Sequence, residues 1–303
     1  MDEIRFDGRV AVVTGAGGGL GRAHALLLAG RGARVVVNDL GGAMDGTGSD
    51  VAPAQQVVNE IKEAGGEAVP NYDSVSDWES AQQIIQTAVD NYGGIDILIN
   101  NAGILRDKSF VKMPVEDYKK VLEVHLDGTF YCTKAAFSYM REHSYGRIIN
   151  TVSAAGLYGN FGQTNYGAAK MGIVGFTLSL KQEGAKYNIL ANILTPVAGT
   201  RLTATILPPE LLEKLKPELV SPMAVWLASE RCGVSGKIFI AGAGYFSRAA
   251  IMEGPGVHLG ADSDISVEMV AERIDEIKSL EGAQEFEAAM DEGSRIFAAL
   301  GTG

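Results

Sequence analysis

The chain has 303 residues, of which 46% are hydrophobic and 21% are charged, a balance typical of an ordinary globular protein. A net charge of −11 disfavours broad nucleic-acid binding, which relies on Lys and Arg side chains to neutralise phosphates. Two cysteines in no metal or redox spacing, a charged N-terminal segment and no long apolar run indicate a soluble, cytoplasmic protein without a membrane-spanning helix.

Short apolar segments alternate with longer helix-like stretches from the start of the chain to about Gly244. The apolar segments are rich in Val and Ile with little polar alternation, as expected for strands covered on both faces. Ser49 and Ser76 are predicted to cap two of the intervening helices. This alternation predicts an α/β fold, a doubly wound parallel sheet with helices on both faces. The seven predicted strands are residues 9–14, 33–39, 67–72, 95–100, 147–152, 189–195 and 237–242.

Beyond Gly244 the strand signals cease, and residues 262–303 are acidic and helix-leaning. These residues carry few capping signals and no recognisable motif. We therefore expect one domain over residues 1–244 that contains the active site. Residues 245–303 are predicted to form a helical extension packed on that same domain.

A glycine-rich segment, residues 14–22, directly follows the first predicted strand. Gly15, Gly19 and Gly21 have the spacing G-x-x-x-G-x-G, and a helical stretch follows them. Glycines let the backbone turn sharply and approach a pyrophosphate, whose charge then lies at a helix N-terminus. A tight strand-to-helix turn without any ligand is the alternative. The segment lacks a Gly-Lys-Ser/Thr ending, which disfavours a nucleoside-triphosphate loop.

Asp39 ends the second predicted strand. An acidic side chain there should accept hydrogen bonds from the adenosine ribose hydroxyls and repel the additional phosphate of NADP. Two like charges at ~4 Å and an effective dielectric near 20 repel by about 4 kcal/mol, so NAD is favoured more than tenfold even if solvent halves that energy. Arg22 offers a phosphate partner, but a solvated surface arginine is the alternative. The predicted cofactor is NAD.

Polar residues also follow the third and fourth predicted strands. Ser74 and Val75 are positioned to line an adenine pocket, and an ordinary turn is the alternative. Asn100 and Asn101 lie beside the predicted cofactor path, and Asn side chains can also tie strands together. For Asn100, a structural role and a ligand contact stay equally open.

Tyr166 and Lys170 are four residues apart, which places both on one face of a helix. An unperturbed tyrosine has a pKa of about 10, too high for efficient proton transfer near neutral pH. An adjacent ammonium and a nicotinium cation would both favour the phenolate and lower that pKa. Ser153 ends the fifth strand, at the sheet edge expected to bind the ligand, and its hydroxyl can orient a substrate oxygen. Together these residues predict a catalytic site for oxidation of an alcohol.

The segments TGAGGGLG, NNAG and YGAAK, with the strand-end Ser153, resemble the short-chain dehydrogenase/reductase family over about residues 6–244. The resemblance implies a seven-stranded Rossmann fold, a Ser–Tyr–Lys mechanism and a homodimer or homotetramer. Two positions depart from the family pattern. His125 stands where the family has Asn, with a buried core histidine as the alternative, and Val197 follows Pro196 where the family has Gly.

Longer segments, including VVVNDLGG, VHL and YGNFGQTNYGAAK, resemble the (3R)-hydroxyacyl-CoA dehydrogenase part of the type 2 peroxisomal multifunctional enzymes, in which this histidine is ordinary. The resemblance implies a free-standing bacterial homologue that oxidises a (3R)-3-hydroxyacyl-CoA with NAD. His125 would continue a water-linked proton path from Lys170. The implied substrate contact is Ser153, and the implied NAD contacts are Leu20, Asp39, Ser74, Val75, Asn101, Tyr166, Lys170, Ala198, Gly199, Thr200 and Arg201.

Several alternatives stay open. The substrate could instead be a hydroxysteroid or another bulky alcohol, and a NAD-binding scaffold or sensor without chemistry is the alternative of a different class. Arg106, Lys108 and Lys112 could meet CoA phosphates or form a solvated loop. Residues 202–215 could be a substrate lid or an amphipathic surface helix.

Two stretches predict self-association. Residues 116–143 and 163–187 carry large apolar side chains on more of their circumference than one sheet face could bury. A four-helix interface in a homodimer or homotetramer would cover the excess.

Overall fold

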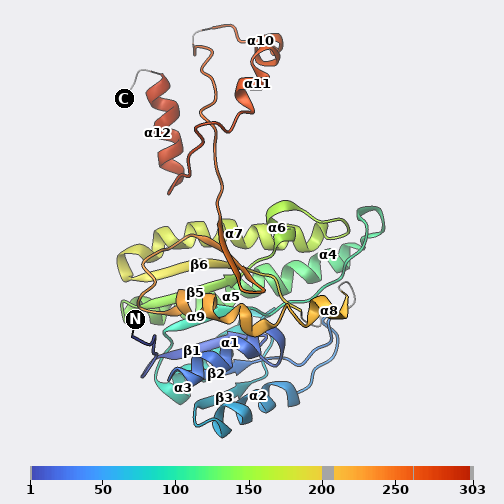
Figure 1. The fold of residues 1–303 in the computed structure, drawn as a ribbon, viewed down its shortest axis with the longest axis vertical. Coiled ribbons are helices and arrows are strands. Elements are labelled where there is room, and N and C mark those ends of the chain that lie inside the picture. Colours follow the sequence, from blue (N-terminus) through green and yellow to red (C-terminus); the bar gives the residue numbers. More distant parts are fainter. Residues whose placement is uncertain (1, 200–207, 262, 301–303) are drawn as a thin grey trace. The chain divides into compact units, whose positions relative to one another are not determined.

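A computed structural model describes residues 2–199, 208–261 and 263–300 (Figure 1). The chain divides into two compact units, Met1–Arg248 and Ala249–Gly303. The second unit contains α10 (Val267–Glu272), α11 (Ile274–Ile277), α12 (Ala289–Ala299) and an antiparallel bridge between Glu253 and Gln284. The packing of this segment on the domain stays a prediction. No helix among the described residues is both long and apolar enough to cross a membrane.

The first unit is built on one sheet with the strand order β3-β2-β1-β4-β5-β6-β7-β8. The strand pairs from β3 to β7 are parallel, as predicted. The order in which the strands are added to the sheet reverses between β1 and β4, the point at which doubly wound sheets bind ligands beyond the carboxyl ends of their strands. The seven predicted strands are β1 (Val10–Thr14), β2 (Arg34–Asn38), β3 (Glu67–Asn71), β4 (Ile97–Asn100), β5 (Gly146–Thr151), β6 (Ile189–Pro196) and β7 (Ile238–Gly242).

An eighth strand, β8 (Tyr245–Ala249), extends the sheet beyond the seven that were predicted. Ala243 and Gly244 connect it to β7, and both have positive φ, 50° and 77°. Positive φ at both central residues is typical of the two-residue turn of a β-hairpin, which antiparallel strands alone can form. The strand was missed because its side chains are largely exposed and give no apolar run.

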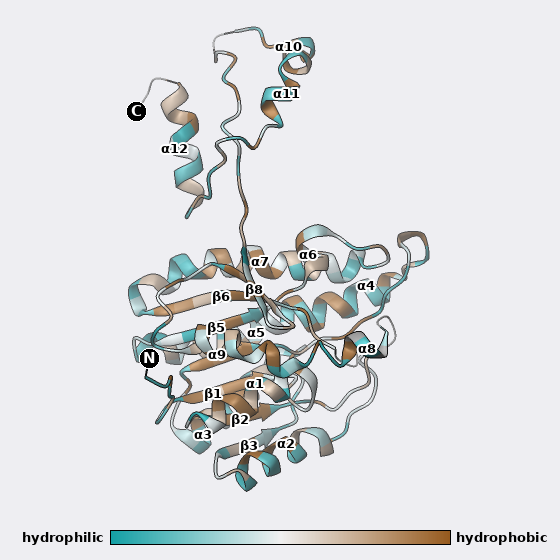
Figure 2. Cartoon of the chain, viewed as in Figure 1, coloured by the Kyte–Doolittle hydropathy of each residue, from teal (hydrophilic) through white to brown (hydrophobic). Residues whose placement is uncertain are grey.

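Helices cover both faces of the sheet. Figure 2 shows the strands as a mainly hydrophobic layer between helices whose residues include many hydrophilic ones. One face buries a cluster with α1 (Gly19–Gly30), α2 (Ala52–Glu63) and α9 (Ser221–Ala228), and the other with α3 (Trp78–Tyr92), α5 (Gly128–Glu142) and α7 (Thr164–Gly184). Each large apolar side chain buried in this way stabilises the fold by about 1.5–3 kcal/mol. The shorter elements are η1 (Phe110–Lys112), α4 (Val115–Leu122), η2 (Glu123–Asp127), α6 (Ala154–Tyr158), η3 (Ala185–Tyr187), α8 (Pro209–Leu212) and η4 (Pro217–Leu219).

Both predicted helix caps were wrong: the N-cap of α2 is Val51, whose side chain makes no capping bond, and the N-cap of α3 is Asp77. Asp50, not Ser49, accepts a hydrogen bond from the first backbone N–H of α2, that of Ala52, at 2.9 Å. Asp77, not Ser76, caps α3 and accepts from the Ser80 N–H at 2.8 Å. In both places a serine and an aspartate are adjacent, and the carboxylate, which only accepts hydrogen bonds, takes the orphan N–H.

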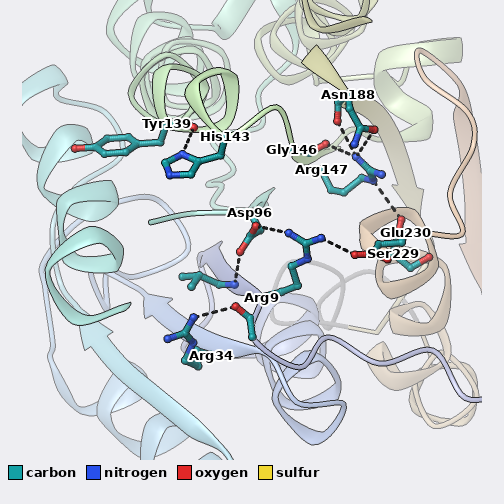
Figure 3. A network of polar contacts seen from close by, with 12 residues as sticks. Arg9, Arg34, Asp96, Tyr139, His143, Gly146, Arg147, Asn188, Ser229 and Glu230 are labelled. Carbon is teal, nitrogen blue, oxygen red and sulfur yellow. Dashed lines mark hydrogen bonds and ion pairs between the residues drawn. The ribbon is translucent and has the colours of Figure 1, made fainter. Parts of the chain in front are cut away.

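A polar network joins the amino ends of the strands, at the edge opposite the predicted site (Figure 3). Arg9 donates to the carboxylates of Asp96 at 2.8 Å and Glu230 at 2.5 Å. The guanidinium groups of Arg9 and Arg147 both lie over the Tyr145 ring, 3.6 and 4.4 Å from its centroid. Arg147 is 3% exposed and donates to the backbone carbonyls of Gly146, Asn188 and Ser229. The network ties β1, β4, β5 and the end of α9 together, which leaves the carboxyl edge for the site.

Candidate active site

One cavity of about 460 Å³ extends along the carboxyl ends of the strands. It reaches from the glycine-rich segment after β1 to the Tyr–Lys pair of α7, so the structure brings the predicted dinucleotide and catalytic residues to a single site. Gly21 and Gly199 do not line it, and Thr200 and Arg201 lie outside the described residues. The predicted site residues in its wall are Gly15, Gly19, Leu20, Asp39, Ser74, Val75, Asn101, His125, Ser153, Tyr166, Lys170 and Ala198.

The glycine-rich segment has the geometry of an anion cradle. Gly15 has φ +62°, and a Cβ on it would lie 2.7 Å from the Ala102 Cα. A Cβ on Gly21 would lie 2.3 Å from the Gly15 carbonyl oxygen, so the helix can approach the loop only without a side chain there. Gly18 caps α1 and provides no side-chain acceptor, which leaves the first backbone N–H groups of the helix free for a ligand. A phosphate is the group that such a helix N-terminus attracts.

The two asparagines after β4 have different roles. The Asn101 Nδ2 donates to the carbonyl oxygens of Thr14 and Gly15, both at 3.0 Å, and so holds the cradle in place. The Asn100 Nδ2 donates to Thr133 Oγ1 at 3.0 Å and Asn150 Oδ1 at 2.8 Å inside the fold. For Asn100 the structure therefore supports the structural alternative. A contact between Asn101 and the dinucleotide stays a prediction.

Asp39 lies at the end of the cavity away from the Tyr–Lys pair. Its Oδ2 accepts from the Gly17 N–H and its Oδ1 from the Gly41 N–H, each at 2.7 Å. The carboxylate is thus fixed, with its remaining lone pairs available to hydroxyl donors. The Arg22 side chain is 36% exposed and forms an ion pair with Glu60 of α2, which favours the surface-arginine alternative over a phosphate partner. This end of the site suits a ribose better than a phosphate.

Ser153, Tyr166 and Lys170 meet at the other end. Ser153 precedes α6, its Oγ accepts from the Ala155 N–H at 3.2 Å, and it lines the cavity together with Tyr166. The Lys170 Nζ donates to the Thr151 carbonyl oxygen at 2.7 Å and lies 5.6 Å from the centroid of the Tyr166 ring. The structure therefore brings the side chains of Ser153, Tyr166 and Lys170 together, as the sequence predicted.

Burial dominates the titration of this group. It raises the pKa of Tyr166 to about 12, against the nearby Ser153 side chain, which lowers the pKa, and with a smaller contribution from the charge of Asp107, which raises it. Burial also lowers the pKa of Lys170 to about 7. The predicted lowering of the Tyr166 pKa by Lys170 was therefore wrong for the chain's own groups, because desolvation outweighs the favourable contacts. A cation brought by the cofactor would have to supply the difference.

His125 lies in η2, a π-helical turn between α4 and α5. Its Nε2 is 3.0 Å from the Ile104 N and 2.8 Å from the Ile104 carbonyl oxygen, and its ring meets the Tyr166 ring edge-on at 5.1 Å and 87°. Burial first and the charge of Lys170 second hold the pKa of His125 well below 6.5. The neutral ring touches Tyr166 directly, and a relay through a charged imidazolium is disfavoured. Relay by the neutral ring stays a prediction.

Some residues of the site carried no sequence signal that identified them. A Cβ on Gly103 would lie 2.3 Å from the His125 Cε1, so the histidine requires a glycine here. Gln163 lines the cavity and donates to the Asp107 carboxylate at 2.6 Å. Lys120 also lines it and pairs with Glu123 at 3.2 Å. The positions of these residues depend on how α4 and α7 pack, which no local pattern encodes.

The structure also bears on the predicted CoA-phosphate residues and on the predicted substrate lid. Arg106 and Lys108 both form ion pairs with Asp117, at 3.1 and 2.9 Å, which supports a self-paired charged loop over a CoA phosphate site. Residues 202–207 of the predicted lid lie outside the described residues; α8 lies within the part of the lid that the structure describes. No group of His, Cys, Asp or Glu suited to hold a metal occurs in the described part of the chain.

Comparison with known proteins places this geometry in context. A family model described as short chain dehydrogenase matches residues 9–208. A short-chain type dehydrogenase/reductase of Mycobacterium tuberculosis is 53% identical over 276 residues, which are 91% of this chain and 96% of that protein. The hydroxyacyl-CoA dehydrogenase ChsB1 of the same organism is 40% identical over 254 residues, covering 78% of this chain and 77% of that one.

Solved structures of other proteins are similar to this fold. Full-length peroxisomal multifunctional enzyme type 2 from Drosophila melanogaster superposes with a TM-score of 0.83 and 40% identity over 98% of this chain, which spans half of that enzyme. A 7α-hydroxysteroid dehydrogenase complexed with NADH and a 7-oxo bile acid superposes with a TM-score of 0.72 and 27% identity, over 79% of this chain and 95% of that one. With its glycine cradle, parallel sheet and Ser–Tyr–Lys group, this chain belongs to the short-chain dehydrogenase family.

Proposed function

We propose that this protein oxidises a secondary alcohol to a ketone with NAD, and that its substrate is a (3R)-3-hydroxyacyl-CoA. The observation that carries the proposal is that Ser153, Tyr166 and Lys170 line the same cavity as the glycine cradle. A proton-transfer group and a dinucleotide cradle in one cavity are what hydride transfer from an alcohol requires. A scaffold or sensor without chemistry would need the cradle alone.

Each residue has a defined task in the reaction. The Ser153 Oγ already accepts the Ala155 N–H, so its own proton is available to hold the alcohol oxygen. Tyr166, as phenolate, takes the hydroxyl proton at its Oη. Lys170 stabilises that phenolate and can donate to a ribose hydroxyl, since an ammonium has three donors and Thr151 occupies one. Bound nicotinamide supplies the hydride acceptor.

The choice of an acyl-CoA rests on the relatives and on His125. Similarity to ChsB1, a hydroxyacyl-CoA dehydrogenase, and to multifunctional enzyme type 2 favours this substrate class. His125, in the position that is ordinary in the multifunctional enzymes, contacts Tyr166 in this chain. Similarity to a hydroxysteroid dehydrogenase at 27% identity keeps a steroid as the second candidate.

The test combines a substrate panel with one substitution. Absorbance at 340 nm with NAD should report turnover of (3R)-3-hydroxyacyl-CoAs in preference to hydroxysteroids. Tyr166→Phe removes the hydroxyl alone and should lower kcat by about 10²–10⁴, with NADH binding changed by less than about threefold. Tyr158→Phe is the matched control, because Tyr158 is 70% exposed and does not line the cavity. NADH binding without turnover of any alcohol would favour the sensor, and substantial activity of Tyr166→Phe would refute the mechanism.

We also propose a cytoplasmic homodimer or homotetramer. Phe130 of α5 and Met171 of α7 are exposed although both are large and apolar, as expected where a second copy covers these helices. Sedimentation of the protein as a monomer would contradict the assembly.

A further inference from the structure

The loop of residues 40–50, which follows β2, is a compact structure with its own internal bonds. Its ends are joined by a hydrogen bond from the Asp50 N–H to the Leu40 carbonyl oxygen at 3.0 Å. Within it, the Ala43 N–H donates to the Thr47 carbonyl oxygen at 2.8 Å. Gly41 has φ +72°, and a Cβ on it would lie 1.8 Å from the Asp50 carbonyl oxygen. A surface loop with closed ends and internal bonds of this kind is an Ω-loop.

The tip of the 40–50 loop is attached to the segment that follows β4. The Met44 carbonyl oxygen accepts the Leu105 N–H at 3.0 Å, and the Asp45 carbonyl oxygen accepts the Arg106 Nε–H at 2.7 Å. A Cβ on Gly46 would already be 3.1 Å from the Ile104 side chain. The loop therefore bridges two strand ends and is held at both, so it forms a fixed wall.

This wall encloses the end of the cavity that Asp39 marks. Leu40 and Met44 of the loop line the cavity beside Asp39, whose Oδ1 accepts the N–H of Gly41. Because the Asp39 Oδ2 also accepts the Gly17 N–H, this one carboxylate connects the cradle to the loop. The adenosine ribose of a dinucleotide in this cavity would lie against the 40–50 loop.

Among the residues that the structure describes around this end of the cavity, no cation is free to bind a phosphate. The 40–50 loop itself has two acidic residues and no Lys or Arg. Among the described side chains that line the cavity, the lysines and arginines are Lys120 and Lys170. Lys120 pairs with Glu123, and Lys170 is at the catalytic end. Phosphate recognition in proteins depends on charge-assisted hydrogen bonds, which this wall does not provide.

We propose that the 40–50 loop is a second determinant of cofactor choice, which rejects a 2′-phosphorylated dinucleotide by enclosing the ribose, independently of the charge on Asp39. The inference rests on the proposed use of NAD and not on the identity of the alcohol. Selectivity for NAD then survives neutralisation of Asp39. It is lost when the charge and the loop are removed together.

The structure indicates how to remove the loop with little disturbance. Excision of residues 42–48 leaves Leu40-Gly41-Ser49-Asp50, in which the bond from the Asp50 N–H to the Leu40 carbonyl oxygen becomes the i to i+3 bond of a β-turn. Gly41 already has the positive φ that such a turn accepts. Asp39→Asn tests the charge, and Asp45→Asn is the matched control, because it removes an exposed charge from the loop without removing its wall.

Calorimetric binding of ADP-ribose and 2′-phospho-ADP-ribose measures selectivity without turnover. We expect Asp39→Asn to retain at least about tenfold preference for ADP-ribose, and the combination of Asp39→Asn with the excision to bring the two Kd values within about threefold. Asp45→Asn should leave the ratio unchanged. A substitution that merely loosens the fold would weaken both ligands alike and leave their ratio intact.

The outcomes separate the two levels of inference. Equal Kd values for Asp39→Asn alone would overturn the role of the loop, and so would tenfold selectivity in the combined variant. Asp39→Asn decides the question by itself if circular dichroism shows that the excised variants do not fold. Failure of the unaltered protein to bind ADP-ribose would instead refute the dinucleotide site on which the proposed function depends.

Discussion

Gly103→Ala is the sharpest steric test of the catalytic end. The new Cβ would lie 2.3 Å from the His125 Cε1, 3.1 Å from its Nδ1 and 3.2 Å from its Nε2. Carbon atoms prefer separations of about 3.5–4.0 Å, so the ring would have to move by roughly 1 Å or more. His125 is 2% exposed and lies between the Ile104 backbone and the Tyr166 ring, so its displacement also disturbs Tyr166.

Overpacking of this kind destabilises a protein by about 1–3 kcal/mol. A displacement of about 1 Å in a catalytic group can lower the rate by about 10²-fold. We therefore expect Gly103→Ala to lower both the free energy of unfolding, measured in urea, and kcat, measured at 340 nm with saturating NAD. Adding His125→Ala should restore part of the stability, since it removes the clashing ring, and a double-mutant cycle should give a coupling of about 0.5–3 kcal/mol.

The control is Gly94→Ala, at which a Cβ would meet nothing within 4 Å. It should change stability by no more than about 0.5 kcal/mol. The reasoning fails if Gly103→Ala matches this control in both stability and kcat. That result would mean that the His125 ring moves aside freely and does not position Tyr166.

Three further outcomes are expected. Gly21→Ala should weaken NADH binding, measured by fluorescence, at least about tenfold, because its Cβ would lie 2.3 Å from the Gly15 carbonyl oxygen; a change below about twofold would contradict the cradle. The His125 Cε1 proton should show no NMR titration between about pH 6 and 8, since its pKa is held well below 6.5, and a midpoint in that range would refute the neutral ring. Lys170→Met should abolish turnover yet unfold at higher urea than the unaltered protein at pH 7. With a folded-state pKa of about 7, Lys170 is largely neutral above that pH, whereas in the unfolded chain it keeps its proton up to about pH 10.4. The free energy of unfolding therefore rises with pH for the unaltered protein, and the advantage of Lys170→Met should shrink by pH 10. An advantage independent of pH would argue against the lowered pKa of Lys170.

The architecture followed from local patterns. Runs of Val and Ile such as β1 and β2 can only be strands buried on both faces, and seven of them in alternation with helices predict the doubly wound sheet. The eighth strand escaped because β8 is exposed and its assignment depends on the turn at Ala243 and Gly244. Both caps were misplaced, and in both places an aspartate next to the predicted serine accepts the backbone N–H.

The candidate site, like the fold, has parts that the sequence predicted and parts that it did not. The sequence alone determined the glycine cradle, the Tyr166–Lys170 pair and the strand-end Ser153, because each depends on spacing within one element or at one strand end. The pKa shift that it predicted for Tyr166 took no account of burial. The pKa of Tyr166 rises to about 12 because the helix that carries it is packed into the interior, and the extent of desolvation is a property of the whole fold.

Contacts between distant segments belong to the tertiary structure alone. The fit of Gly103 to His125, the bonds from Asp39 to Gly17 and Gly41, and the attachment of the 40–50 loop at Leu105 join parts of the chain that local propensities treat as independent. The sequence thus predicted which groups would react and indicated which cofactor is favoured. The packing of the elements decided how those groups are held, because distance, burial and steric fit emerge only when separate elements meet.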